Sequence, residues 1–236
     1  MLPSNLSRRN CLQLMSAGSA VLLNARRLSA QQNKPNPAFA SVDDIPGLPR
    51  VLLIGDSISI GYTLDVRDIL QGEANVHRPP TNCGPTEKGL QELDAWLGSK
   101  SWDVIHFNWG LHDLKYVDGK SGLVDVGQGK RTNTLAGYGN NLEALVVRLK
   151  KTGATLIWTA TTPIPKGSKG RIPGDEVQYN VAAKDIMKKH GVAIDDLYTY
   201  SDMYVRALQR EANVHYMPEG SRLLAEQVVK AIRSAL

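Results

Sequence analysis

The chain has 236 residues, of which 42% are hydrophobic, and this is enough for one domain with a sizeable core. Its formal net charge is +5, but four positive charges lie in the first 30 residues, which hold no acid: Arg8, Arg9, Arg26 and Arg27. The rest of the chain is nearly neutral and has no basic run, which argues against nucleic acid or an anionic membrane as a partner.

Residues 1–30 are typical of an export signal. The pair Arg8-Arg9 precedes an apolar stretch, 12–23, that is too short to span a bilayer as a mature helix, and small residues at 28–30 offer a cleavage point. The two arginines resemble a twin-arginine signal, although Cys11 stands where such signals usually carry a large apolar residue. A Sec signal and an attached amphipathic helix are the alternatives. We expect export to the periplasm or the exterior, with no membrane anchor after cleavage.

Residues 31–48 are rich in proline and small polar residues, which predicts a linker, and residues 49–236 are expected to form the folded domain. Cleavage of the signal would leave Cys83 as the single cysteine, so no internal disulfide is expected. No neighbouring base or cation activates this thiol, which favours a packing role.

Short apolar runs alternate with segments of helical spacing from residue 50 onward. The runs that predict buried strands are 51–54, 74–76, 104–107, 155–158 and 192–194. The segments that predict helices are 58–70, 89–97, 135–150, 177–190 and 223–232. This alternation predicts right-handed βαβ units, and therefore an α/β fold: a flavodoxin-like three-layer α/β/α sandwich with a central parallel sheet. The long stretch 115–131 is either a mobile flap or a disordered surface excursion.

Ligands of such sheets bind at the carboxyl ends of the strands, and several polar motifs fall there. Gly55-Asp56-Ser57-Ile58-Ser59 follows the first strand and opens a helix, whose positive end would favour a developing oxyanion; simple capping by Asp56 or Ser57 is the alternative. The other motifs are Asn82-Cys83-Gly84-Pro85-Thr86, Gly110-Leu111-His112-Asp113, and His215-Tyr216-Met217-Pro218-Glu219-Gly220 before the last helix.

These four motifs, in this order, resemble conserved blocks of the SGNH/GDSL hydrolases, a family of serine esterases. The resemblance implies Ser57 as nucleophile, His215 as base, and the amides of Ser57 and Gly84 as oxyanion donors. His112 stands where the family carries an oxyanion asparagine, and a neutral imidazole can also donate one hydrogen bond. If His112 faces away, Asn108 or Asn82 could contribute instead.

The acid of the catalytic triad is missing from its usual place, because the position three residues before the base is Ala212. Glu211 is adjacent, but on an extended segment it would point elsewhere unless the loop is kinked. A backbone carbonyl could take its place, and Asp113 is more typical of a residue that holds a loop. We therefore expect a Ser57–His215 dyad, with Glu211 as a candidate support.

No metal ion and no cofactor is expected. His106, His112 and Asp113 are close in sequence, but strand alternation does not aim all three side chains at one point. Tyr62 and Trp109 lie near the expected site and could stack on a sugar ring or belong to the core.

The predicted function is an exported serine esterase that hydrolyses a small-molecule or glycan ester through an acyl-enzyme on Ser57. Export, and the lack of a long apolar groove signature, favour a carbohydrate O-acetylesterase over a lysophospholipase or thioesterase. The alternative is a non-catalytic carbohydrate-binding protein on a degenerate hydrolase fold. Ala212 and His112 favour that alternative, whereas the joint presence of Ser57, Gly84 and His215 argues against it.

Overall fold

The computed structural model describes residues 35–120 and 122–236. The expected export signal, 1–30, lies outside the described residues. The chain divides into two compact units, Met1–Pro37 and Ala38–Leu236, and the elements below belong to the second.

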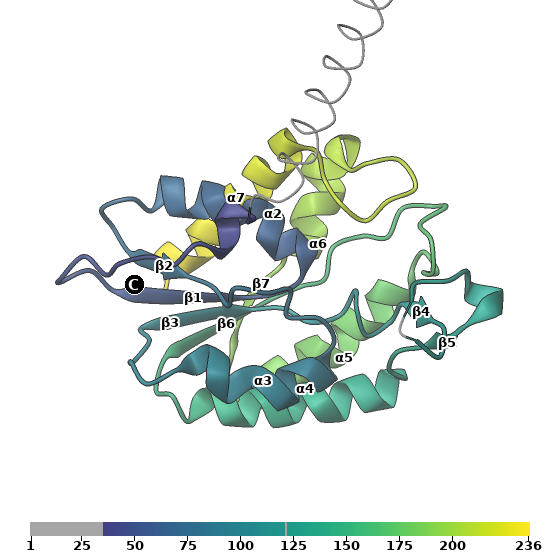
Figure 1. The fold of residues 1–236 in the computed structure, drawn as a ribbon, viewed down its shortest axis with the longest axis horizontal. Helices are drawn as coiled ribbons and strands as arrows, with labels where there is room; N and C mark the ends of the chain where they lie inside the picture. The colour runs from purple at the N-terminus through teal and green to yellow at the C-terminus, as the bar shows by residue number, and fades with distance from the viewer. Residues whose placement is uncertain (1–34, 121) are drawn as a thin grey trace, which may run out of the picture. The chain divides into compact units, whose positions relative to one another are not determined.

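A five-stranded parallel sheet forms the centre of this unit, with strand order β2-β1-β3-β6-β7 (Figure 1). The strands are β1 (Arg50–Ile54), β2 (Asn75–His77), β3 (Val104–Phe107), β6 (Thr155–Thr159) and β7 (Ala193–Asp195). All five predicted strands are confirmed, each within about two residues of the expected bounds. Because β1 lies between β2 and β3, the chain reverses direction of winding there, and the loops after these strands meet at one edge.

Two groups of helices cover the sheet. Helices α2 (Ser57–Ile69), α6 (Leu197–Tyr200) and α7 (Pro218–Arg233) lie on one face, and α3 (Thr86–Leu97), α4 (Leu135–Lys150) and α5 (Asp175–His190) lie on the other (Figure 1). Five of these match predicted helices, and the short α6 was not predicted. The three-layer α/β/α architecture is therefore confirmed. Helix α7 packs along α2, which brings the end of the chain back to the first helix.

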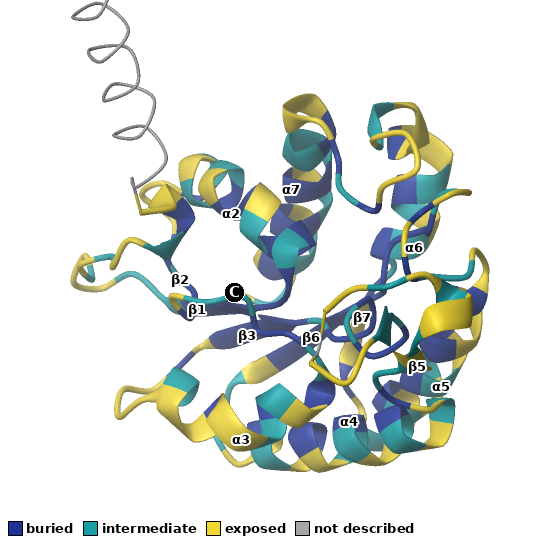
Figure 2. Ribbon diagram, turned by 45° about the vertical axis from the view of Figure 1, so that its right-hand side comes forward, coloured by how far each residue is buried: buried dark blue, intermediate teal, exposed yellow. Residues whose placement is uncertain are grey.

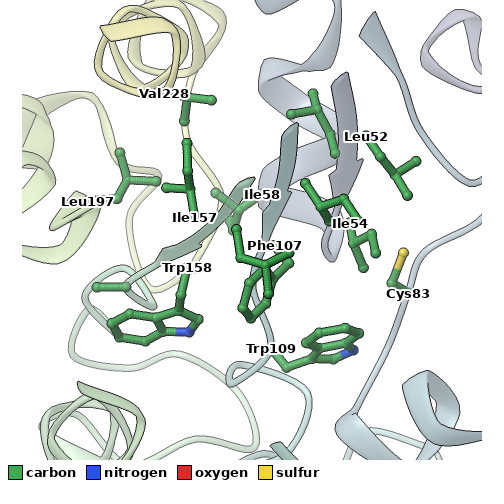
Figure 3. Packing of buried hydrophobic residues seen from close by; sticks show 14 of the residues in the cluster. Leu52, Ile54, Ile58, Cys83, Phe107, Trp109, Ile157, Trp158, Leu197 and Val228 are labelled. Carbon is green, nitrogen blue, oxygen red and sulfur yellow. The ribbon is translucent and has the colours of Figure 1, made fainter. Parts of the chain in front are cut away.

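Strands β1, β2, β3 and β6 are largely buried, as their apolar runs predicted, and the helices turn exposed residues outward (Figure 2). The prediction of a buried strand at 192–194 needs correction, because Ala193 and Ile194 of the edge strand β7 are exposed. Ile157 faces Val228 of α7 on one side of the sheet, and Trp158 and Trp109 pack on the other (Figure 3). Trp109 and Tyr62 are each only 1% exposed. Both rings therefore belong to the core and offer no platform for a sugar.

The expected boundary at residue 49 needs correction, because residues 38–48 belong to the same compact unit as the rest. Ala38 is buried. The Asn75 side chain donates to the carbonyl oxygens of Ile45 and Leu48 and accepts from the Ile45 N–H. Asp44 forms ion pairs with Arg50 and Lys100. These long-range polar contacts fix the segment on the domain, although its composition is that of a linker.

The long stretch 115–131 carries secondary structure in its described part. Strands β4 (Tyr116–Val117) and β5 (Lys130–Arg131) pair antiparallel, and a 3-10 turn, η2, covers Val126–Gln128. Within 35–120 and 122–236, we find no helix that has both the length and the apolar character to cross a bilayer.

Candidate active site

Ser57 is the first residue of α2 and stands directly beyond the end of β1. The turn between them is tight, since a Cβ atom on Gly55 would lie 2.6 Å from Cβ of Ser59. Asp56 caps the helix by accepting a hydrogen bond from the Ile58 N–H at 2.9 Å. The capping role falls to Asp56, which leaves the Ser57 hydroxyl free to face the edge of the sheet.

His215 is far from Ser57 in the sequence but contacts it in the folded chain. Its Nε2 lies 2.8 Å from Ser57 Oγ, although the two residues are 158 positions apart. His215 belongs to a tight hairpin, residues 208–217, in which Arg210 N–H donates to the His215 carbonyl and Met217 N–H donates to the Leu208 carbonyl. Helix α7 begins at Pro218, five residues before the predicted start at 223, and proline suits the first turn of a helix. The hairpin and the helix start together hold the imidazole over Ser57.

Asn213 occupies the place of the missing acid. Its Oδ1 accepts from the His215 backbone N–H at 3.0 Å and lies 2.6 Å from His215 Nδ1. Because an amide oxygen only accepts hydrogen bonds, Nδ1 carries the proton and Nε2 is left to accept the Ser57 hydroxyl proton. Burial lowers the pKa of His215, and nearby Arg171 and Arg210 lower it further while Asp56 raises it. The imidazole is therefore neutral, as a base requires, at pH 7.

Sequence reasoning missed Asn213 because it assumed an extended segment before His215. Ala212 has a positive φ of 49°, the only such non-glycine residue in 35–120 and 122–236. This kink turns Asn213 under the imidazole. Glu211, the expected support, is exposed and makes no hydrogen bond or ion pair to any described residue. The candidate support of the base is accordingly corrected from Glu211 to Asn213.

The expected backbone donors differ in their availability. Ser57 N–H sits in the first turn of α2, and no described residue accepts from it. Gly84 N–H donates to Asn82 Oδ1 at 2.9 Å, so this donor already has a partner. The Gly84 N–H is therefore occupied by Asn82, and it can donate to an oxyanion only after this hydrogen bond breaks. No pattern in the sequence indicates this local contact.

His112 has the chemistry expected of a side-chain donor. Lys115 Nζ lies 3.3 Å from its Nδ1, and an ammonium group can only donate, so Nδ1 accepts. Burial, chiefly, lowers the pKa of His112 to about 4. The ring is thus neutral, with its hydrogen on Nε2. Asn108, the alternative donor, already donates to Thr159 O at 2.7 Å.

Asp113 belongs to a buried network that fastens the loop after β3. It accepts from Thr86 N–H, from Thr86 Oγ1 at 2.5 Å and from Asn133 Nδ2 at 2.7 Å. Burial, the largest influence, raises the pKa of Asp113 to about 6. The carboxylate does not contact His215, so it holds the loop and is not the missing acid.

Arg78 is a further residue that sequence reasoning did not single out. Its buried guanidinium donates to Ser59 Oγ, to Thr63 Oγ1 and to the carbonyl oxygens of Gly55 and Thr81. These bonds tie the segment after β2 to the turn that carries Ser57. Cys83, in the same segment, is buried, and burial raises the pKa of its thiol to about 11. The thiol is therefore inert at neutral pH.

The three residues considered as metal ligands are separated by their partners. His106 Nε2 faces Asp195 inside the core at 3.2 Å, His112 contacts Lys115, and Asp113 contacts Thr86. In the part of the chain that the structure describes, no group of three or more His, Cys, Asp or Glu side chains could hold a metal ion.

An open groove of about 600 Å³ lies beside the Ser57–His215 pair. It is lined by Ser57, Ile58, Gly61, Leu64, Asp65, Arg210, His215, Tyr216, Pro218 and Ser221. Its walls come from α2 and from the hairpin with the start of α7. A substrate in this groove would reach the Ser57 hydroxyl directly.

No protein-family model matches the chain, and no curated protein matches it. Several solved structures do match the chain. A lipase/acylhydrolase from Enterococcus faecalis has a TM-score of 0.65 and 19% identity, over 79% of this chain and 96% of that one. An acetylxylan esterase from Geobacillus stearothermophilus has a TM-score of 0.63 and 18% identity, over 78% and 94%.

A GDSL-like lipase from Bacteroides thetaiotaomicron has a TM-score of 0.63 and 15% identity, over 90% of this chain and 98% of that one. The match covers nearly the whole length of each of these three structures, but the sequence identities are low. What they share with this chain is therefore the fold. The chain has the three-layer α/β fold of the SGNH/GDSL hydrolases.

Proposed function

We propose that this chain is a serine hydrolase that cleaves carboxylic esters through an acyl-enzyme on Ser57. The observation that carries the proposal is the 2.8 Å contact between Ser57 Oγ and His215 Nε2, with the opposite ring nitrogen held by Asn213. A serine becomes a nucleophile when a neutral, oriented imidazole can accept its proton. This arrangement meets that requirement.

In the proposed reaction, Ser57 Oγ attacks the ester carbonyl carbon while its proton passes to His215 Nε2. The tetrahedral intermediate places its negative oxygen near the Ser57 N–H and the positive end of α2, with His112 as a further donor. The bond to the alcohol then breaks, and the imidazolium returns the proton to the leaving oxygen. Water repeats the sequence on the acyl-enzyme and releases the carboxylic acid.

The amide of Asn213 suits this role less well than a carboxylate would. It orients the imidazole, but it carries no charge to stabilise the imidazolium that forms during the reaction. We therefore propose a slower enzyme than a full triad would give. The contact between the Ser57 hydroxyl and His215, together with the open groove beside it, favours an enzyme over a binding protein.

One experiment tests the activity. The purified protein is treated with a fluorophosphonate probe and assayed on a chromogenic acetate ester, alongside Ser57→Ala. We expect labelling and turnover in the parent and neither in the variant. If the folded parent shows neither, the esterase proposal is wrong, and the result favours the alternative of a non-catalytic carbohydrate-binding protein.

We further propose that the substrate is an acetylated carbohydrate. An acetylxylan esterase is among the structures of the same fold, and the groove is open and partly polar, with Asp65, Arg210 and Ser221 along it. Acetate release from acetylated oligosaccharides should exceed hydrolysis of long-chain acyl esters. A preference for long acyl chains would instead indicate a lipid substrate.

We also propose that the protein is exported, because the arginine pair and the apolar stretch in residues 1–30 are typical of an export signal. Expression of the full chain followed by cell fractionation and mass spectrometry of the mature N-terminus tests it. We expect cleavage near residue 30, and Arg8→Lys with Arg9→Lys should block export if the twin-arginine route is used. Uncleaved protein in the cytoplasm would contradict export.

A further inference from the structure

Arg171 is a half-buried cation that contacts Leu111, and Leu111 lines a small pocket with Asp56 and Ile58, the neighbours of Ser57. Its Nε donates to the Leu111 carbonyl oxygen at 3.1 Å, and no carboxylate of the described residues forms an ion pair with it. Burial lowers its pKa, while the Asp56 carboxylate, which caps α2, raises it. Removing a guanidinium from water without a counter-ion is unfavourable, and such groups commonly meet their anion in a ligand.

The backbone around Arg171 is held in place by the loop that carries His112. Gly170 has a φ of 62°, and a Cβ atom there would lie 2.6 Å from Val124 O. The Gly170 carbonyl oxygen accepts from the Tyr116 N–H at 2.7 Å. Arg171 is therefore fastened on two sides, through Leu111 and through Tyr116, and its position does not depend on a flexible surface loop.

Lys115 adds a second positive charge to the same loop. It is half-buried, and its ammonium contacts His112 Nδ1, which is neutral and supplies no charge. Leu111 and His112 are adjacent, so the two cations contact consecutive residues of the same loop. Burial and the charge of Arg171 lower the pKa of Lys115, while the charges of Asp113 and Asp56 raise it. Arg171 also lowers the pKa of His215, so its positive potential reaches the base.

From these two cations at the loop after β3, neither of which forms an ion pair with a carboxylate of the described residues, we propose, as a refinement that rests on the esterase function above, that the substrate carries a carboxylate close to the scissile ester, bound by Arg171 and Lys115. A planar guanidinium matches a carboxylate in geometry, and Lys115 contributes a point charge. The substrate class is thus an acetylated acidic sugar, such as a uronic acid unit. Binding it relieves the repulsion between the two cations.

A matched pair of substrates tests this. Methyl glucoside and methyl glucuronoside, each acetylated at the same hydroxyl, differ in the carboxylate alone, and acetate release gives kcat/KM for both. We expect the parent to prefer the glucuronoside by about tenfold at low salt and less at high salt. Arg171→Gln should reduce this ratio at least about fivefold, Lys115→Gln should reduce it too, and Arg171→Lys should retain part of it.

Lys169→Gln is the control, because Lys169 is exposed, forms no hydrogen bond or ion pair with any described residue and lies two positions from Arg171. Its ratio should equal that of the parent. A parent ratio near one, with labelling and turnover intact, overturns this inference and leaves the esterase function standing. An equal loss of kcat/KM on both substrates in Arg171→Gln also overturns this inference and leaves the esterase function standing. Absence of labelling and turnover in the parent overturns the esterase function and this inference with it.

Discussion

An amide contacts the His215 imidazole where a catalytic triad would have a carboxylate. Asn213 Oδ1 binds both the backbone N–H and Nδ1 of His215, so it selects one tautomer without adding negative charge. Burial then keeps the pKa of His215 below its ordinary value. The neutral base is present above this lowered pKa and is lost as the pH falls through it. Proposed activity should therefore persist into mildly acidic solution.

Replacing Asn213 tests this orientation directly. Asn213→Ala leaves the Nδ1 proton without its acceptor, and kcat on an acetate ester should fall by about 100-fold. Asn213→Asp adds a negative charge next to the imidazole, which raises the pKa of His215. The acidic limb of the pH profile of kcat/KM should then move to higher pH.

Glu211→Gln is the matched control, since Glu211 is exposed and makes no described contact. Its kcat and its pH profile should match those of the parent. A loss in Glu211→Gln as large as that in Asn213→Ala would return Glu211 to the mechanism.

The hairpin formed by residues 208–217 carries both Asn213 and His215. Its ends are joined by the Arg210–His215 and Met217–Leu208 backbone hydrogen bonds, and the Gln209 side chain ties it to Pro163 O and Val214 O. The turn depends on Ala212, whose left-handed conformation is unfavourable for most residues. Ala212 lies close to Gly167, since a Cβ atom added at Gly167 would lie 3.1 Å from Ala212 Cβ.

Ala212→Val should distort this hairpin. A β-branched residue is strained at positive φ by about 1–2 kcal/mol, so the turn should shift and displace His215 from Ser57. We expect fluorophosphonate labelling to slow by about tenfold or more, together with a lower melting temperature. Ala212→Gly accepts the same φ and should label at the parent rate. Parent-like labelling of the valine variant would show that the turn does not position the base.

At the scale of the whole molecule, the site exists because α7 returns along α2, on the face of the sheet opposite α3, α4 and α5 (Figure 1). Asp113 joins segments on the other side of the site: the loop after β3, the first residue of α3 through Thr86, and Asn133 ahead of α4. This network lies in the core and holds the His112 loop against the domain.

Asp113→Ala should lower the free energy of unfolding by about 1–3 kcal/mol, because it leaves buried donors of Thr86 and Asn133 unpaired. The pKa of Asp113 is raised to about 6 from its ordinary 3.8, so the folded state holds the proton more tightly than the unfolded state. The contribution of this carboxyl is therefore present at low pH and declines as the pH rises through 3.8 toward 6.

Urea unfolding at pH 4.5 and pH 7 measures the effect. The loss caused by Asp113→Ala should be larger at pH 4.5 than at pH 7. A larger loss at pH 7 would show that the carboxylate form is the better-bound one in the folded state.

The sequence alone determined the fold of the domain and the order of its motifs. Short continuous apolar runs such as 51–54 and 104–107 favour buried strands in a covered parallel sheet, and their alternation with helical segments predicts the layers. The same reasoning placed Ser57 at the end of β1 and His215 before α7. These features are local in sequence, so periodicity and residue type suffice to predict them.

Tertiary structure decided what contacts those residues. Asn213 reaches His215 only because Ala212 adopts a positive φ, and the Gly84 amide is occupied by Asn82 only because that loop folds back. Arg171 contacts Leu111 in the loop after β3, although the two residues are 60 positions apart in the sequence. Hydrophobic patterning carries no information on such contacts, because they depend on single backbone angles and on polar side chains that meet after the sheet has formed.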